Sequence, residues 1–263
     1  DPTSDSLTIG AAYHGNWNSF TINQTAGTLT SNSRFDMGGA TGSGGSTYQS
    51  YYNLSGGRLD LNSHDFRLGY SNAGDGNRTY LNLSGSGILD FVNANVGRAD
   101  LRISGGTLTG SGLFKMNHTD FNPLLWIDGS SALSISFGSM NAYNGGSATI
   151  RYTMDASGVT AMDVGTLNLN SGANVSMLEV DMTNWDGVSG LNNGHIILAN
   201  YTTLNGTFSS VNVTGGSGTV VYDYDAGDGG TAIALYVVPE PGTLLLTGVG
   251  LMCCGMARRK KRR

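Results

Sequence analysis

The chain has 263 residues, of which 41 are glycine and only 13% are charged, a composition unlike that of an average cytosolic enzyme. Its net charge is −5, but residues 1–236 carry 18 acidic and 8 basic side chains and therefore a net charge of −10. A surface of this sign repels phosphate backbones, so we expect no nucleic-acid partner.

Residues 1–158 contain an internal repeat built from three short strand-like units. The first unit places two apolar residues two positions apart, as in a strand with one buried face. Its expected inward residues are Ile22, Leu54, Leu83, Ile103, Ile127 and Tyr152. The second unit begins with an expected inward leucine, at Leu29, Leu59, Leu89, Leu108 and Leu133. The third unit exposes Asp36, Arg67, Asn95 and Lys115.

Successive first units are 32, 29, 20, 24 and 25 residues apart, with glycine between the units and no helical stretch. This spacing predicts an all-β fold, a right-handed parallel β-helix whose coils stack about 4.8 Å apart. A β-sandwich is the alternative, and it requires hairpin turns of about two to five residues. The repeat resembles the glycine-rich strand repeats called autotransporter-associated.

Residues 159–236 keep strand patterns but lose the regular repeat. Because the end of a stack exposes a sheet edge and an apolar core, we expect final coils followed by an antiparallel β cap here. Asp223, Asp225 and Asp228 are weak metal-ligand candidates, because their spacing misses that of a calcium loop. A polar hairpin turn is the favoured interpretation, and we expect no cofactor.

The last 27 residues consist of three parts in a fixed order. Pro239-Glu240-Pro241 ends the preceding strand, because proline fixes φ and lacks a backbone N–H. The uncharged run 242–257 spans about 24 Å as a helix, against about 30 Å for the hydrocarbon core, and suits a transient transmembrane anchor. Six basic residues, which are costly to bury in a bilayer, end the chain: Arg258, Arg259, Lys260, Lys261, Arg262 and Arg263.

This order of motif, apolar run and basic cluster resembles the PEP-CTERM sorting signal, which exosortases recognise and remove. The resemblance implies that Pro239-Glu240-Pro241 is the recognition element and that the basic cluster is a cytoplasmic stop signal. It also implies export, transient anchoring in the inner membrane and delivery to the cell surface. The chain starts at Asp1 rather than Met, and we expect that a secretory signal peptide preceded it.

The sequence contains no recognisable catalytic constellation. His14, His64, His118 and His195 fall at unrelated repeat positions, and the outward positions of the repeat alternate in charge as cross-strand ion pairs do. We therefore expect a non-enzymatic protein, and the resemblance to the sorting signal implies a surface or matrix protein associated with exopolysaccharide in a biofilm. The alternative is a carbohydrate-binding or polysaccharide-degrading protein. It would use the carboxylate pair Asp60 and Asp90, or stacking platforms at Trp17, Trp126, Tyr51 and Tyr143.

Overall fold

The structure is a computed structural model, and it contains only β-strands and loops in the part of the chain that it describes. Within that part, no helix is long and apolar enough to cross a membrane. The predicted transmembrane run 242–257 lies outside it. The described residues are 6–9, 20–38, 49–61, 64–69, 78–116, 122–130, 133–142, 147–170, 175–227 and 230–238.

The strands form two sheets. The eight-stranded sheet contains β2 (Thr21–Gln24), β5 (Gln49–Leu54), β8 (Arg78–Leu83), β11 (Ala99–Ile103), β13 (Leu124–Asp128), β15 (Ser147–Thr153), β17 (Val175–Asp181) and β20 (Ser210–Thr214), in that order. The main path of the fourteen-stranded sheet is β1 (Ser6–Ile9), β4 (Arg34–Met37), β7 (Phe66–Leu68), β10 (Ala94–Val96), β12 (Gly106–Met116), β14 (Leu133–Asn141), β16 (Met162–Asn168), β19 (His195–Asn205), β22 (Thr231–Val237) and β21 (Gly218–Asp225). Beside this path lie β3 (Thr28–Thr30), β6 (Arg58–Asp60), β9 (Ile88–Phe91) and β18 (Leu191–Asn192).

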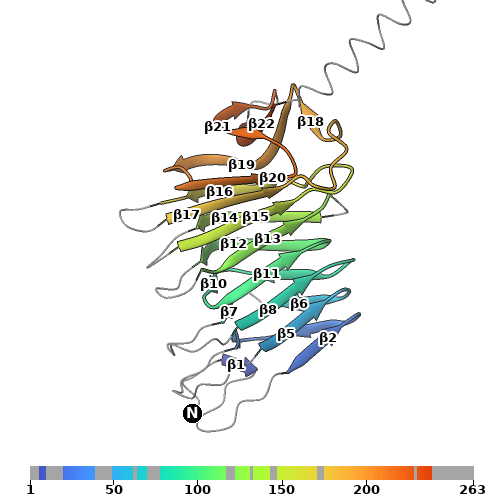
Figure 1. The fold of residues 1–263 in the computed structure, drawn as a ribbon. Helices are drawn as coiled ribbons and strands as arrows, with labels where there is room; N and C mark the ends of the chain where they lie inside the picture. Colours follow the sequence, from blue (N-terminus) through green and yellow to red (C-terminus); the bar gives the residue numbers. More distant parts are fainter. Residues whose placement is uncertain are drawn as a thin grey trace, which may run out of the picture.

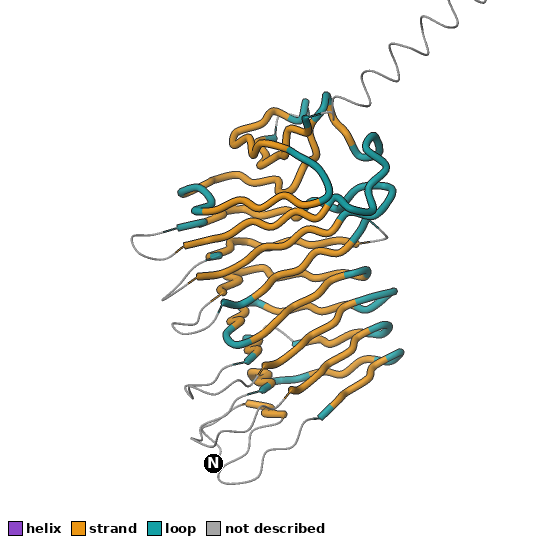
Figure 2. Tube along the Cα trace, in the orientation of Figure 1, coloured by secondary structure: helices purple, strands orange, loops and turns teal. Residues whose placement is uncertain are grey.

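From β2 to β20 the chain passes from one sheet to the other and back, and the strands of these two sheets pair in parallel with strands one turn earlier, except for the short β18. Figure 1 shows the strands stacked in layers from β2 to β20, and Figure 2 shows the loops at the edges of the layers. We call this stack the rod. Its parallel pairing is compatible with a parallel β-helix and unlike the antiparallel strands of a β-sandwich.

Glycine is required where the chain turns between units. Gly57 has a φ of +76°, and a Cβ atom there would lie 2.2 Å from the carbonyl oxygen of Gly27 one turn below. The Gly27 carbonyl also accepts a hydrogen bond of 2.8 Å from the backbone N–H of Arg58. A side chain at position 57 would therefore clash with the turn beneath it and strain its own backbone.

The predicted first-unit ladder is confirmed from the second turn onward. Its members pair in register and are at most 1% exposed: Leu54, Leu83, Ile103, Ile127 and Tyr152. The placement of Ile22 was wrong, because Ile22 pairs with Tyr52 and Gln24 takes the position beside Leu54. Gln24 accepts a hydrogen bond from the Tyr52 hydroxyl and donates one of 2.9 Å to the carbonyl of Arg58.

The predicted second-unit ladder holds for Leu29, Leu59, Leu89 and Leu108 but was wrong at Leu133. Leu108 pairs with Ile135, which is 2% exposed, whereas Leu133 pairs with Gly106 and is half-buried. The inward position of this unit therefore falls two residues later, at Ile135. In the corner before β14, the backbone N–H of Ser130 donates a hydrogen bond of 2.8 Å to the Asp155 carboxylate.

Three separate strands per turn occur only in the first turns. Strand β12 joins the second and third units into one strand with a shift in register between Gly110 and Leu113. Strands β14 and β16 follow the same path. The third-unit prediction survives this change, because Asp36, Arg67, Asn95 and Lys115 still pair in one outward row.

Parallel pairing continues past residue 158 through β16, β17, β19 and β20. The direction then changes, because β22 pairs antiparallel with both β19 and β21. Residues 232–235 of β22 are at most 1% exposed and cover the core at this end of the rod.

Candidate functional site

The outward face of the eight-stranded sheet collects aromatic and charged side chains. Tyr51 and Tyr80 stack with ring centroids 4.8 Å apart and an interplanar angle of 10°. Trp126 lies further along the same sheet, in register with Arg102 and Arg151 of the neighbouring strands. Of the four predicted stacking platforms, the structure thus brings Tyr51 and Trp126 to one face, and Trp17 and Tyr143 lie outside the described residues. Tyr80 was missed, although it repeats Tyr51 at the same position.

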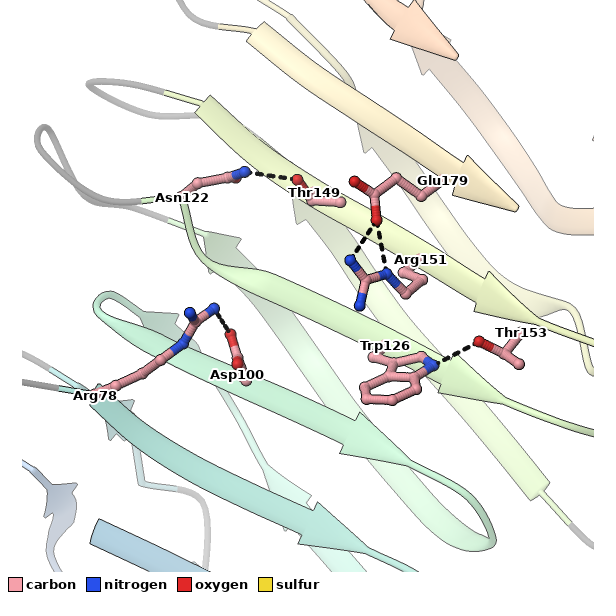
Figure 3. Close-up of polar contacts among 8 residues, drawn as sticks. All are labelled: Arg78, Asp100, Asn122, Trp126, Thr149, Arg151, Thr153 and Glu179. Atoms are coloured by element: carbon pink, nitrogen blue, oxygen red, sulfur yellow. Dashed lines mark hydrogen bonds and ion pairs between the residues drawn. The ribbon is translucent and has the colours of Figure 1, made fainter. Parts of the chain in front are cut away.

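Cations from two strands flank the Trp126 indole. The guanidinium carbon of Arg102 lies 4.2 Å from the ring centroid and that of Arg151 lies 5.5 Å from it. The indole N–H donates a hydrogen bond of 2.9 Å to the Thr153 hydroxyl (Figure 3). A sugar ring that stacked on this indole would compete with the arginine side chains for the ring face. The part of the indole that a ligand can contact without this competition is its outward edge.

Each arginine of this face is paired with an acid, as Figure 3 shows for two of the pairs. Arg78 binds Asp100, Arg102 binds Asp128 through Nε at 2.9 Å, and Arg151 binds Glu179 at 2.6 Å. Burial raises the pKa of the Asp100 carboxyl, and the neighbouring Arg78 opposes that shift. Because the charges are balanced, the face suits an uncharged polar ligand better than a strongly anionic one.

A shallow groove of about 430 Å³ runs beside this tryptophan. Its walls carry a guanidinium, carboxylates, hydroxyls and an amide, contributed among others by Trp126, Arg151, Thr153, Glu179, Asp181 and Asn212. Groups of these kinds both donate to and accept from hydroxyl groups. The groove can therefore bind a hydroxyl-rich ligand by hydrogen bonds, with an aromatic edge at its rim.

Asparagines form a hydrogen-bonded ladder on the first three strands of this face. The Asn53 amide donates to the Asn23 side chain at 2.7 Å, and the Asn82 amide donates to Asn53 at 2.8 Å. A second ladder joins the side chains of Asn141, Asn168 and Asn205 on the other sheet at 2.7 Å per step. These amides stabilise the stacking of the turns.

The two candidate carboxylates share one arginine. Asp60 and Asp90 are neighbours in register, and Arg58 contacts both, at 3.5 Å and 2.5 Å. The predicted cross-strand pairing of opposite charges is confirmed here, as it is at Arg102–Asp128 and Arg151–Glu179. General acid–base catalysis by two free carboxylates is not the arrangement found at this position.

The metal-ligand candidates face separate partners. Asp223 accepts a hydrogen bond of 2.6 Å from the Tyr201 hydroxyl, and Asp225 accepts one of 2.8 Å from the backbone N–H of Gly227. Asp228 lies outside the described residues, and within those residues no group of three potential ligands could hold a metal. The predicted hairpin is confirmed, because Asp225 pairs antiparallel with Thr231.

The histidines occupy unrelated places. His195 stacks on Tyr224 with centroids 4.2 Å apart and contacts Tyr236 at 5.0 Å. His64 lies in the corner before β7, where its backbone N–H donates to Leu61 at 2.8 Å. His14 and His118 lie outside the described residues.

The folded chain ends immediately before the predicted recognition element. Val237 is the last residue of β22, and the backbone N–H of Val238 donates a hydrogen bond of 3.1 Å to Ser217. The next residue in the sequence is Pro239. Pro239-Glu240-Pro241, the run 242–257 and the basic residues 258–263 all lie outside the described residues.

Residues 237–263 match the family model of the PEP-CTERM protein-sorting motif. The chain carries a PEP-CTERM sorting signal. That signal implies an exported protein which an exosortase recognises and sorts. No curated protein and no solved structure matches the chain. The resemblance to autotransporter-associated repeats stays a prediction. The PEP-CTERM match begins at Val237, which is also the last residue of β22, so the signal follows the folded strand without a linker.

Proposed function

We propose that this chain is a non-enzymatic protein of the cell surface or extracellular matrix, which an exosortase cleaves near Pro239-Glu240-Pro241 and which associates with exopolysaccharide. The observation that carries the proposal is the PEP-CTERM match at residues 237–263. Asp60 and Asp90 are the candidate catalytic carboxylates, and their ion pairs with Arg58 support a structural role for them.

The proposal includes an architecture. Residues 1–158 form a right-handed parallel β-helix, residues 159–236 form its final coils and antiparallel cap, and residues 237–263 form the sorting signal. The parallel registers and the antiparallel β22 support the first two parts. Residues 242–257 cross the inner membrane as a short helix, and residues 258–263 remain in the cytoplasm until cleavage. The released rod then reaches the cell surface or the surrounding matrix.

Substitution of the two prolines tests the sorting step. We expect Pro239→Ala with Pro241→Ala to leave export intact but to keep the full-length chain in the membrane, because the extended recognition element is lost. The measurement is the intact mass of the released protein from cells with and without exosortase. Wild-type protein should lose the six terminal basic residues only when exosortase is present. Retention in the membrane of a form that still ends at Arg263, even when exosortase is present, would show that the tail is a plain anchor.

A second candidate function is carbohydrate binding on the outward face of the eight-stranded sheet. The convergence of Tyr51, Tyr80 and Trp126 on one face, beside a groove lined by hydrogen-bonding groups, favours it. Because Arg102 and Arg151 lie against the Trp126 ring and its N–H is bonded to Thr153, binding would depend on the hydrogen-bonding groups of the groove more than on sugar stacking.

Affinity for the polysaccharide of the producing cells tests this candidate. Asn212→Ala in the groove should weaken retention on immobilised polysaccharide by about two- to tenfold, since a lost hydrogen bond costs about 0.5–1.5 kcal/mol. The matched control is Asn205→Ala, an exposed asparagine on the other sheet, which should leave retention unchanged. Equal effects of the two substitutions would contradict a site in this groove.

A further inference from the structure

Exposed apolar side chains gather in the last part of the folded chain. Within the described residues, the large hydrophobic side chains that remain exposed are Val188 (68%), Val211 (42%), Tyr236 (43%) and Val238 (46%). Strands β20, β21 and β22 lie at the end of the rod opposite its N-terminal strands (Figure 1). Isolated exposed apolar residues are ordinary, but a collection at one end of a molecule indicates an interaction surface.

An apolar groove adjoins the point where the chain leaves the rod. The groove measures about 490 Å³ and lies between β20 and β21, where Val211, Val213, Val220 and Tyr222 line it. Ser217 also lines it and accepts the hydrogen bond from Val238. The exposed apolar surface and the exit of the chain are therefore parts of the same region.

An aromatic cluster lies on the outward side of β22 in this region. Tyr236 pairs in register with His195, whose ring contacts both Tyr236 and Tyr224. Tyrosine combines an apolar ring with a polar hydroxyl and is enriched where proteins meet the polar boundary of a bilayer. The residue types at this end therefore suit a lipid boundary.

The length of the connection fixes how far this end can be from the membrane. Only three residues separate Val238 from Gly242, the first residue of the apolar run. A fully extended chain covers at most about 3.6 Å per residue, so Val238 lies within about 14 Å of the point where that run enters the bilayer. A gap of this size leaves room for lipid head groups and little else.

We propose that the C-terminal end of the rod, formed by β20, β21 and β22, rests on the lipid surface of the membrane while the tail is inserted. The inference rests on the proposed insertion of residues 242–257. Tyr236, Val238 and the groove around Val211 contact the boundary between head groups and acyl chains. The carboxylates of Asp223 and Asp225 lie on β21, so the surface favours zwitterionic over strongly anionic lipid. The contact holds the sorting motif at the height of the bilayer surface.

Site-specific photo-crosslinking of the full chain tests the contact. The photoreactive amino acid p-benzoylphenylalanine replaces Tyr236, and the protein is reconstituted in sealed phosphatidylcholine vesicles and irradiated. We expect a lipid adduct on the tryptic peptide that contains position 236. The matched control places the same residue at Tyr51, near the opposite end of the rod, where we expect no lipid adduct.

Three outcomes are distinguishable. In vesicles that contain the wild-type protein, external trypsin tests insertion of the tail independently of the crosslink. An inserted tail protects Arg258–Arg263 from cleavage. If the basic tail is cleaved, the proposed insertion fails and this inference fails with it. If the tail is protected but position 236 yields only a protein adduct, to a second copy or another protein, the insertion stands and the lipid contact is wrong. If position 236 yields a lipid adduct, and if the double substitution Val211→Ser with Val238→Ser lowers the yield of that adduct, the apolar surface described here is supported.

Discussion

Inward side chains in this rod depend on the residue at the same position one turn away. At Leu83, the neighbours in register are Leu54 and Ile103, and all three are fully buried. Leu54 has a polar neighbour in register on its N-terminal side, because Gln24 occupies that position and accepts a hydrogen bond from the Tyr52 hydroxyl. Tyr52 is fully buried, and this burial raises the pKa of its hydroxyl to about 12.

Leu83→Asp should unfold the turns on both sides of β8. An unpaired carboxylate in this ladder has no partner, and its burial costs several kcal/mol more than a cavity does. Leu83→Ala serves as the control, because it leaves a cavity and costs about 2–5 kcal/mol. Urea denaturation of both variants measures the difference. Equal losses of unfolding free energy would contradict a dry, continuous ladder at this position.

The sequence predicted most inward positions because apolar residues two apart mark a half-buried strand. It failed at Ile22 because Gln24 occupies an inward position that period-two patterns assign to apolar residues. It failed at Leu133 because Leu133 and Ile135 are both apolar and two positions apart, and only the register shows that Ile135 is the residue paired with Leu108. The aromatic and charged rows could be read from the repeat, but the arrangement of cations around Trp126 required the register of three strands.

At the scale of elements, β22 closes the core as an antiparallel strand. It pairs with β19 on one side and β21 on the other, and it carries Ile233 and Leu235 into the core, while the alternate residues Ala232 and Ala234 are buried as well. The change in strand direction ends the series of parallel turns. It also leads the chain directly to the sorting motif, so the last strand both covers the core and presents the tail.

Leu235→Ala should therefore destabilise the rod by about 2–5 kcal/mol, the usual cost of removing most of a fully buried leucine. Val238→Ala, three residues later on the same segment, is the control, since Val238 is exposed and its backbone hydrogen bond remains. We expect the control to change stability by no more than about 0.5 kcal/mol. Thermal and urea unfolding measure both, and a Leu235→Ala variant as stable as the control would show that β22 is dispensable for the core.

At the scale of the whole molecule, the rod is a one-dimensional stack in which strands pair with those of adjacent turns, and Phe91 also contacts Phe137 two turns away, across Gly110. Stability in such a stack is close to a sum of turns and of the interfaces between them. Where a carboxylate holds the corner of a turn by hydrogen bonds, its protonation at low pH therefore lowers the stability of the whole rod. Such corners are found at Asp155, Asp181 and Asp186.

The pKa values of these three carboxyls are lowered. Burial acts to raise the pKa of Asp155, but hydrogen bonds from Ser130 and Ser157 outweigh it and lower the pKa. The side-chain hydroxyl of Thr183 lowers the pKa of Asp181, and that of Ser189 lowers the pKa of Asp186. A carboxyl whose pKa is lower in the folded state stabilises the fold above its unfolded pKa, and that contribution is lost as the pH falls through the folded value.

Asp155→Ala isolates this effect at the corner that joins Gly129 and Ser130 to the next turn. At neutral pH the variant should unfold at a lower temperature than the wild type, because the ionised carboxylate accepts several hydrogen bonds there. As the pH falls below 3.8, the ordinary value for this group, the wild type loses that contribution and the two melting temperatures should converge. The difference between the two proteins is the quantity to measure, because burial raises the pKa of Asp100 and gives the rod an opposing pH dependence. A gap between the melting temperatures that stays constant from neutral pH to about pH 2 would mean that the carboxylate charge does not hold this corner.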